Sequence, residues 1–160
     1  MRTTRIVRHL RAPRAAVYQA IIDAASVQRW MVPQGMRSEV HVFESRQGGA
    51  FRISLTYDAP DAKGKSSAHT DTYHGRFVEL VPDEKVVQVM EFETEDPAMQ
   101  GEMKATFTLR DDGEGTELVG VHEDLPRGVR LEDNDLGWRM AFAKLAELVE
   151  RASAAPVGGD

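Results

Sequence analysis

Two histidines and an aspartate lie close together in residues 69–74, and imidazole and carboxylate groups are good ligands for transition metals. The surrounding residues read as a β-strand, in which successive side chains point to opposite faces. His69 and Asp71 would then share one face while His74 points to the other, so that only two ligands converge. We therefore expect no metal site here.

The signatures of nucleophilic catalysis and of nucleotide binding are missing from the sequence. The chain has no cysteine, and no serine lies in a nucleophile-elbow motif. The acidic run of Asp111, Asp112 and Glu114 falls in a turn, where carboxylates are solvated. Gly48 and Gly49 are not followed by the helix and lysine of a phosphate-binding loop. The sequence therefore predicts no bound cofactor and no set of catalytic residues.

Composition restricts the partners and the location. A net charge of −6 disfavours sequence-independent binding to nucleic acid, which requires Lys and Arg to neutralise phosphates. No stretch reaches the ~20 apolar residues that span a membrane, and residues 1–10 lack the apolar core of a signal peptide. With no cysteine to form disulfides, we expect a cytoplasmic protein that is not inserted in a membrane.

The periodicity of the apolar residues predicts an α+β fold. Alternation predicts strands at residues 3–10, 39–43, 51–57, 69–80, 86–93, 102–110 and 116–124. Helical spacing predicts one or two short helices at 13–23 and 25–31 and a long one at 133–151. This order favours a curved antiparallel sheet of seven strands wrapped around the terminal helix. Residues 1–151 would form a single domain, and residues 152–160 a flexible tail.

Two of the segments between these elements have residue types that are typical of turns and loops. Gly48 and Gly49 precede the alternating residues 51–57, as expected for the turn of a β-hairpin. Residues 58–67 contain Pro60, Gly64 and several charges, so we expect a long exposed loop that could act as a lid.

Six short motifs lie along this order of elements. They are Trp30-Met-Val-Pro33-Gln-Gly35, Gly48-Gly-Ala-Phe51, Gly75-Arg-Phe-Val-Glu-Leu-Val-Pro82, Gly115-Thr116, His122 and Gly137-Trp138. With them, the chain resembles the bacterial homologues of the C-terminal domain of the heat-shock-protein-90 ATPase activator. That family belongs to the START-like, birch-pollen-allergen-like (SRPBCC) superfamily. The resemblance covers about residues 3–151 and implies a helix-grip fold, but members commonly carry a second tryptophan where this chain has Met31.

In such a fold a cavity can lie between the sheet and the terminal helix, and its apolar walls would suit a small hydrophobic ligand. Tyr57, Tyr73 and His122 are the polar groups expected near it, while Trp30 and Trp138 could line its mouth or fill the core. The frequent methionines suit either an adaptable pocket or the gaps of a core. The predicted ligand-binding residues are Trp30, Phe51, Ile53, Tyr57, Tyr73, Met103, Phe107, His122, Trp138 and Phe142.

Three functions are compatible with these features, and the binding of a small hydrophobic ligand without catalysis is the leading hypothesis. The resemblance implies a second, a co-chaperone partner of a heat-shock-protein-90-like ATPase. The third is a cyclase-like or lyase-like enzyme that uses His122, Tyr73 or Glu79 as acid or base. Both a monomer and a homodimer agree with the sequence.

Overall fold

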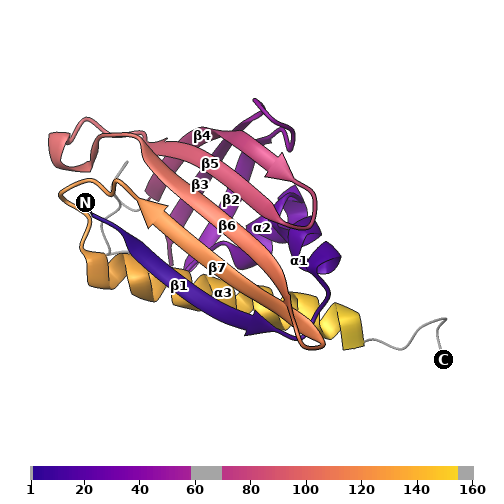
Figure 1. The fold of residues 1–160 in the computed structure, drawn as a ribbon. Coiled ribbons are helices and arrows are strands. Elements are labelled where there is room, and N and C mark those ends of the chain that lie inside the picture. Colours follow the sequence, from indigo (N-terminus) through magenta and orange to yellow (C-terminus); the bar gives the residue numbers. More distant parts are fainter. Residues whose placement is uncertain (1, 59–69, 155–160) are drawn as a thin grey trace.

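The computed structural model describes residues 2–58 and 70–154. Within these ranges one strand is followed by two short helices, six more strands and a long helix (Figure 1). The strands are β1 (Thr4–Leu10), β2 (Met36–Phe43), β3 (Ala50–Tyr57), β4 (Thr70–Val81), β5 (Lys85–Phe92), β6 (Met103–Asp112) and β7 (Gly115–Glu123). The helices are α1 (Arg14–Ile21), α2 (Ala24–Trp30) and α3 (Leu131–Ala154), with a short 3-10 helix, η1 (Pro97–Met99). The predicted α+β fold is confirmed.

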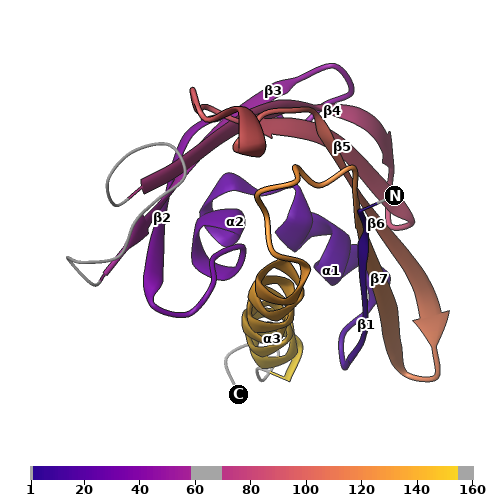
Figure 2. The ribbon, with the colours of Figure 1, turned by 90° about the vertical axis from the view of Figure 1, so that its left-hand side faces the viewer.

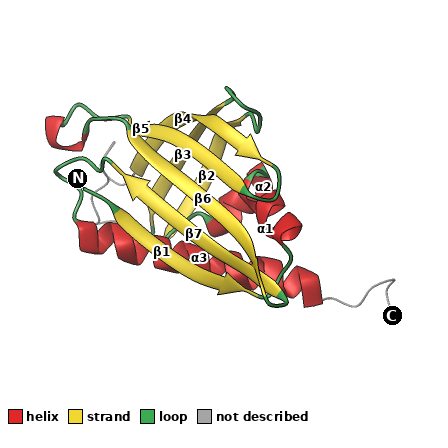
Figure 3. Cartoon of the chain, viewed as in Figure 1, coloured by secondary structure: helices red, strands yellow, loops and turns green. Residues whose placement is uncertain are grey.

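All seven described strands belong to one antiparallel sheet in the order β1-β7-β6-β5-β4-β3-β2. Because β1 pairs with β7, the start of the chain lies beside its last strand, and Thr4 faces His122 across that pair. Seen along α3, the sheet forms an arch with the three helices on its concave side (Figure 2). Figure 3 shows the same division into one layer of strands and one of helices. The predicted helix-grip arrangement is therefore confirmed.

The hairpin between β2 and β3 turns where the two glycines predict it. Gly48 has a φ of +80°, a conformation that residues with a side chain rarely adopt. At Gly49 a Cβ atom would lie 2.0 Å from the carbonyl oxygen of Glu44. Phe43 and Phe51 pair on either side of the turn. Glycine at both positions therefore sets the register of the hairpin.

Most elements lie within one or two residues of the predicted ranges, whereas β2 and α3 each extend three residues beyond one predicted end. β2 begins at Met36 instead of residue 39, because residues 36–38 pair with β3 although their polarity gives no clear alternation. α3 runs from Leu131 to Ala154 instead of 133–151, and Asp133 lies in its first turn. An acidic side chain there interacts favourably with the positive end of the helix. The predicted lid at 58–67 lies outside the described residues except for Asp58.

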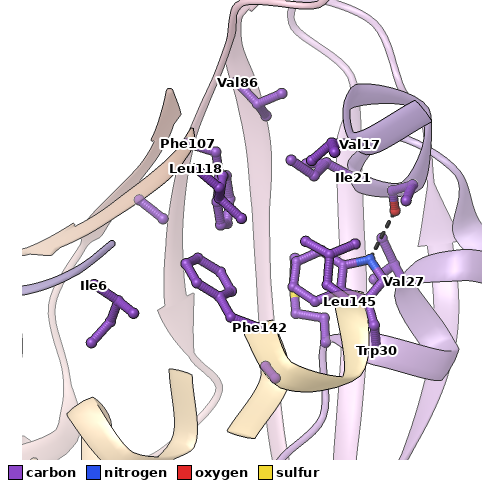
Figure 4. Packing of buried hydrophobic residues seen from close by; sticks show 14 of the residues in the cluster. Ile6, Val17, Ile21, Val27, Trp30, Val86, Phe107, Leu118, Phe142 and Leu145 are labelled. Carbon is purple, nitrogen blue, oxygen red and sulfur yellow. Dashed lines mark hydrogen bonds between the residues drawn. The ribbon is translucent and has the colours of Figure 1, made fainter. Parts of the chain in front are cut away.

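The core fills the end of the arch that holds α1 and α2. Trp30, the last residue of α2, is fully buried and its Nε1 donates a hydrogen bond to the carbonyl oxygen of Ala20 at 2.8 Å (Figure 4). Its ring packs edge to face on Phe107 of β6, with centroids 6.4 Å apart, and lies 6.3 Å from the ring of Phe142 of α3. These contacts join α2 and α3 to the sheet. None of the helices in the described ranges is long and apolar enough to cross a membrane.

Candidate functional site

A cavity of about 490 Å³ lies between the concave face of the sheet and the first half of α3. Strands β2 to β7, the segment after α2 and the segment before α3 contribute to its wall. The lining residues are Met31, Pro33, Gln34, Met36, Phe43, Phe51, Ile53, Leu55, Tyr57, Asp71, Tyr73, Gln88, Met90, Phe92, Met103, His122, Gly128, Val129, Arg130, Asp133, Asn134, Leu136, Gly137, Trp138, Met140 and Ala141.

The position of the helices explains why space remains at this end of the arch. Both α1 and α2 contact α3, and in Figure 1 they lie beside its C-terminal half. The first half of α3 instead faces the inward side chains of β3, β4 and β5 across the cavity. A twisted, curved sheet diverges from a straight helix, so the two surfaces separate here.

The wall of the cavity is mainly apolar and unusually rich in methionine. Five of the seven methionines of the chain line it: Met31, Met36, Met90, Met103 and Met140. Unbranched thioether side chains adapt easily to guests of different shape. The sequence left open whether these methionines fill the core or line a pocket, and the structure places these five on the wall.

His122 is the centre of a polar network on the wall. Its Nδ1 accepts a hydrogen bond from Trp138 Nε1 at 3.0 Å and a second one from Asn134 Nδ2 at 3.2 Å. Thr4 Oγ1 orients Asn134 by donating to its Oδ1 at 2.6 Å. Because an indole nitrogen can only donate, Nδ1 carries no proton and the proton of the neutral ring is on Nε2. Nε2 is buried and has no hydrogen-bond partner among the described residues.

Burial lowers the pKa of His122 to about 4. The charged form loses solvation in this environment, and its protonated Nδ1 could no longer accept from Trp138. The ring is therefore neutral at physiological pH.

We expect this neutral histidine to make the fold sensitive to mild acid. The unfolded side chain binds a proton near pH 6.5, whereas the folded one binds it only near pH 4. The unfolded state thus takes up the proton first, and the free energy of unfolding falls between these values, by at most roughly 3 kcal/mol. Thermal unfolding from pH 7.5 to 4 should show a steeper decline for the wild type than for His122→Gln, which cannot titrate. Parallel curves for the two proteins would contradict this expectation.

Three further polar residues of the wall lie on the inward faces of β4 and β5. The hydroxyl of Tyr73 donates only to the sulfur of Met31, at 3.8 Å, and burial raises its pKa. Asp71 and Gln88 are each 3% exposed and line the same cavity, although the sequence analysis did not propose them. Strand phase could have indicated both, since Asp71 shares a face with Tyr73, and Gln88 shares one with Met90.

The structure brings most of the predicted ligand-binding residues together. Seven of the ten line the cavity: Phe51, Ile53, Tyr57, Tyr73, Met103, His122 and Trp138. Trp30, Phe107 and Phe142 do not, because they pack against one another in the core beside it. Phe107 and Phe142 instead border a much smaller space of about 10 Å³.

Asp71 and His74 lie on opposite faces of the sheet. Asp71 lines the cavity on the concave side, whereas His74 contacts Glu91 and Glu93 at 3.1 Å each on the other face. His69 lies outside the described residues. Within residues 2–58 and 70–154, no three His, Cys, Asp or Glu side chains cluster closely enough to hold a metal ion.

The curled antiparallel sheet, the long helix across it and the cavity between them define a helix-grip protein of the START-like (SRPBCC) class. A family model described as "Activator of Hsp90 ATPase homolog 1-like protein" matches residues 11–150, and the chain belongs to this family. The family resemblance noted from the sequence motifs is thereby confirmed.

Solved structures agree with this assignment. Protein CV1439 from Chromobacterium violaceum has a TM-score of 0.83 and 32% sequence identity, and the match covers 93% of this chain and 97% of that one. A Rhodobacter sphaeroides protein has a TM-score of 0.77 at 19% identity, with 94% and 93% of the two chains covered. Protein Ms6760 from Mycobacterium smegmatis has a TM-score of 0.71 at 16% identity, with 97% and 92% covered. The last two support the fold alone. A comparison with curated proteins gave no match.

Proposed function

We propose that this protein binds a small, mainly apolar molecule in the cavity between the sheet and α3. The observation that carries the proposal is the cavity itself, since about 490 Å³ lies within the range of roughly 300–1,000 Å³ typical of ligand pockets. Each 100 Å² of apolar ligand surface buried there would contribute about 2.5 kcal/mol. A modest apolar ligand could therefore bind without any charged contact.

The protonation states of the wall residues favour binding over acid–base catalysis. A general acid or base works best with a pKa near the operating pH. His122 is neutral with its pKa lowered to about 4, and burial shifts the pKa of Tyr73 upward, away from neutrality. Glu79, the third group considered as a catalyst, pairs with Lys85 at 2.9 Å and is absent from the cavity wall. Neither His122 nor Tyr73 thus has a pKa near neutrality, and Glu79 lies away from the cavity.

Binding can be tested with Nile red, an uncharged apolar dye whose emission rises in apolar surroundings. We expect saturable binding of one dye per chain, together with quenching of the emission of Trp138, which lines the cavity. The dye should also raise the unfolding midpoint, because it binds only the folded state. Native mass spectrometry of freshly purified protein would detect a co-purified natural ligand. A failure of Nile red to bind, with no co-purified molecule, would exclude the proposed function.

A further inference from the structure

Gln88 is a polar residue in an apolar part of the cavity wall. It is 3% exposed, and its neighbours on the inward face of β5 are Val86 and Met90. Its side-chain amide forms no hydrogen bond within the described part of the chain, and its polar atoms are not fully enclosed, because the residue borders the cavity. An apolar ligand that displaced water from this amide would leave it without a partner, which is costly. This cost is offset when a ligand supplies the partner.

The register of the sheet places a second uncharged donor near Gln88. Gln88 pairs with Ala105 on β6, and Ala105 pairs with His122 on β7, so the three form one row across the sheet. Two strand spacings put the Cα atoms of Gln88 and His122 roughly 10 Å apart. The small side chain of Ala105 lies between them in the row. His122 has a further donor, Nε2–H, which has no hydrogen-bond partner among the described residues.

The charges of the wall argue against an anionic guest. Its acidic residues are Asp71 and Asp133, and its one cationic side chain within the described residues is that of Arg130. Arg130 is already paired with Glu132 at 3.2 Å and lies 3.9 Å from Asp133. A carboxylate or phosphate in the cavity would thus lose its hydration without meeting an unpaired positive charge from residues 2–58 or 70–154.

These observations deepen the proposed function and rest on it. We infer that the cavity selects an uncharged, mainly apolar molecule with a carbonyl or hydroxyl group, and that Gln88 is the residue that pairs with this group. The amide of Gln88 can both donate and accept, which suits either group. His122 Nε2–H supplies an additional donor to the same oxygen. Fatty acids and other anions should bind more weakly, because the described wall residues offer no unpaired cation to their charge.

Three naphthalenes of similar size test this inference: acetylnaphthalene, an uncharged ketone; isopropenylnaphthalene, its hydrocarbon counterpart; and naphthoate, an anion. Isothermal titration should show the ketone binding roughly tenfold more tightly than the hydrocarbon, the scale of one or two net hydrogen bonds. Naphthoate should bind most weakly. In Gln88→Leu, the preference for the ketone over the hydrocarbon should largely disappear, while the hydrocarbon binds at least as well as in the wild type.

Controls separate the inference from the proposed function. Gln19→Leu makes the same change at an exposed site on α1 and should leave all three affinities unchanged. Gln88→Leu should unfold at a temperature close to that of the wild type, since the side chain it replaces makes no hydrogen bond within the described residues. Equal binding of ketone and hydrocarbon by the wild type, an unchanged preference in Gln88→Leu, or tightest binding of naphthoate would each overturn the inference while leaving ligand binding intact. Binding of none of the three would refute both.

The protonation of the two ring nitrogens of His122 can be measured without any substitution. Nitrogen NMR at neutral pH should show the proton on Nε2 and none on Nδ1, as the hydrogen bond from Trp138 requires. Addition of acetylnaphthalene should shift the Nε2 resonance, and isopropenylnaphthalene should shift it much less. Equal shifts with both probes would show that His122 does not bind the carbonyl oxygen of the ketone.

Discussion

Trp30→Ala is expected to destabilise the protein by about 4 kcal/mol, as for the truncation of a large, fully buried aromatic side chain. Trp30 has no exposed surface, and its ring contacts Phe107 on the sheet and Phe142 on α3. Its loss also removes the hydrogen bond to the carbonyl oxygen of Ala20. In a domain of this size the unfolding midpoint should fall by roughly 10 °C, measured by thermal denaturation and by chemical denaturation with fitted slopes.

Trp138→Ala is the matched control for this experiment. Trp138 is only partly buried, and one side of its ring faces the cavity, so its removal enlarges a space that already exists. We therefore expect a clearly smaller loss of stability than in Trp30→Ala. An equal or larger loss in Trp138→Ala would show that the anchor between helix and sheet is Trp138 instead.

Gly137→Phe is expected to abolish the binding of Nile red, or to weaken it at least tenfold, without unfolding the protein. Gly137 lies inside α3 and on the cavity wall. A Cβ atom there would meet only Pro33, at an ordinary contact distance of 3.6 Å, and Pro33 is itself part of the wall. The phenyl ring would thus extend into the cavity and take the place of a ligand. Fluorescence titration of the dye measures the effect.

Gly137→Ala separates occupation of the cavity from the effect of removing a glycine. Alanine in a helix interior is more favourable than glycine by roughly 1 kcal/mol. Gly137→Ala should therefore unfold at a higher temperature than the wild type and still bind Nile red. Normal dye binding by Gly137→Phe would mean that the dye lies elsewhere, and the proposed site would then be wrong.

Much of the fold follows from local signals in the sequence. Alternation identifies all seven strands, and Gly48 and Gly49 identify the hairpin that begins β3. These signals are reliable because strand phase and turn conformation depend on a few neighbouring residues. The same phase also determined which side chains of β3 face inward, which is why Phe51, Ile53 and Tyr57 were correctly placed on the concave side.

The roles of the two tryptophans could only be decided by the tertiary structure. Both sit at helical positions beside apolar residues, so the sequence assigned both to the cavity. Trp30 ends α2 and is enclosed in the buried core, whereas Trp138 lies in the first half of α3, which borders the cavity. The distance between two elements that meet only in the folded chain cannot be predicted from neighbouring residues.

The arrangement of the polar residues on the cavity wall also depends on contacts between distant parts of the chain. Gln88 and Asp71 were readable as inward-facing from strand phase, but only the pairing of β5, β6 and β7 aligns Gln88 with His122. The tautomer of His122 likewise depends on Trp138 and Asn134, which α3 brings to it from a later part of the chain. The sequence by itself thus determined the strands, their faces and the long helix, because these depend on neighbours. The tertiary structure decided which inward side chains meet, because strand register and helix position depend on contacts between distant residues.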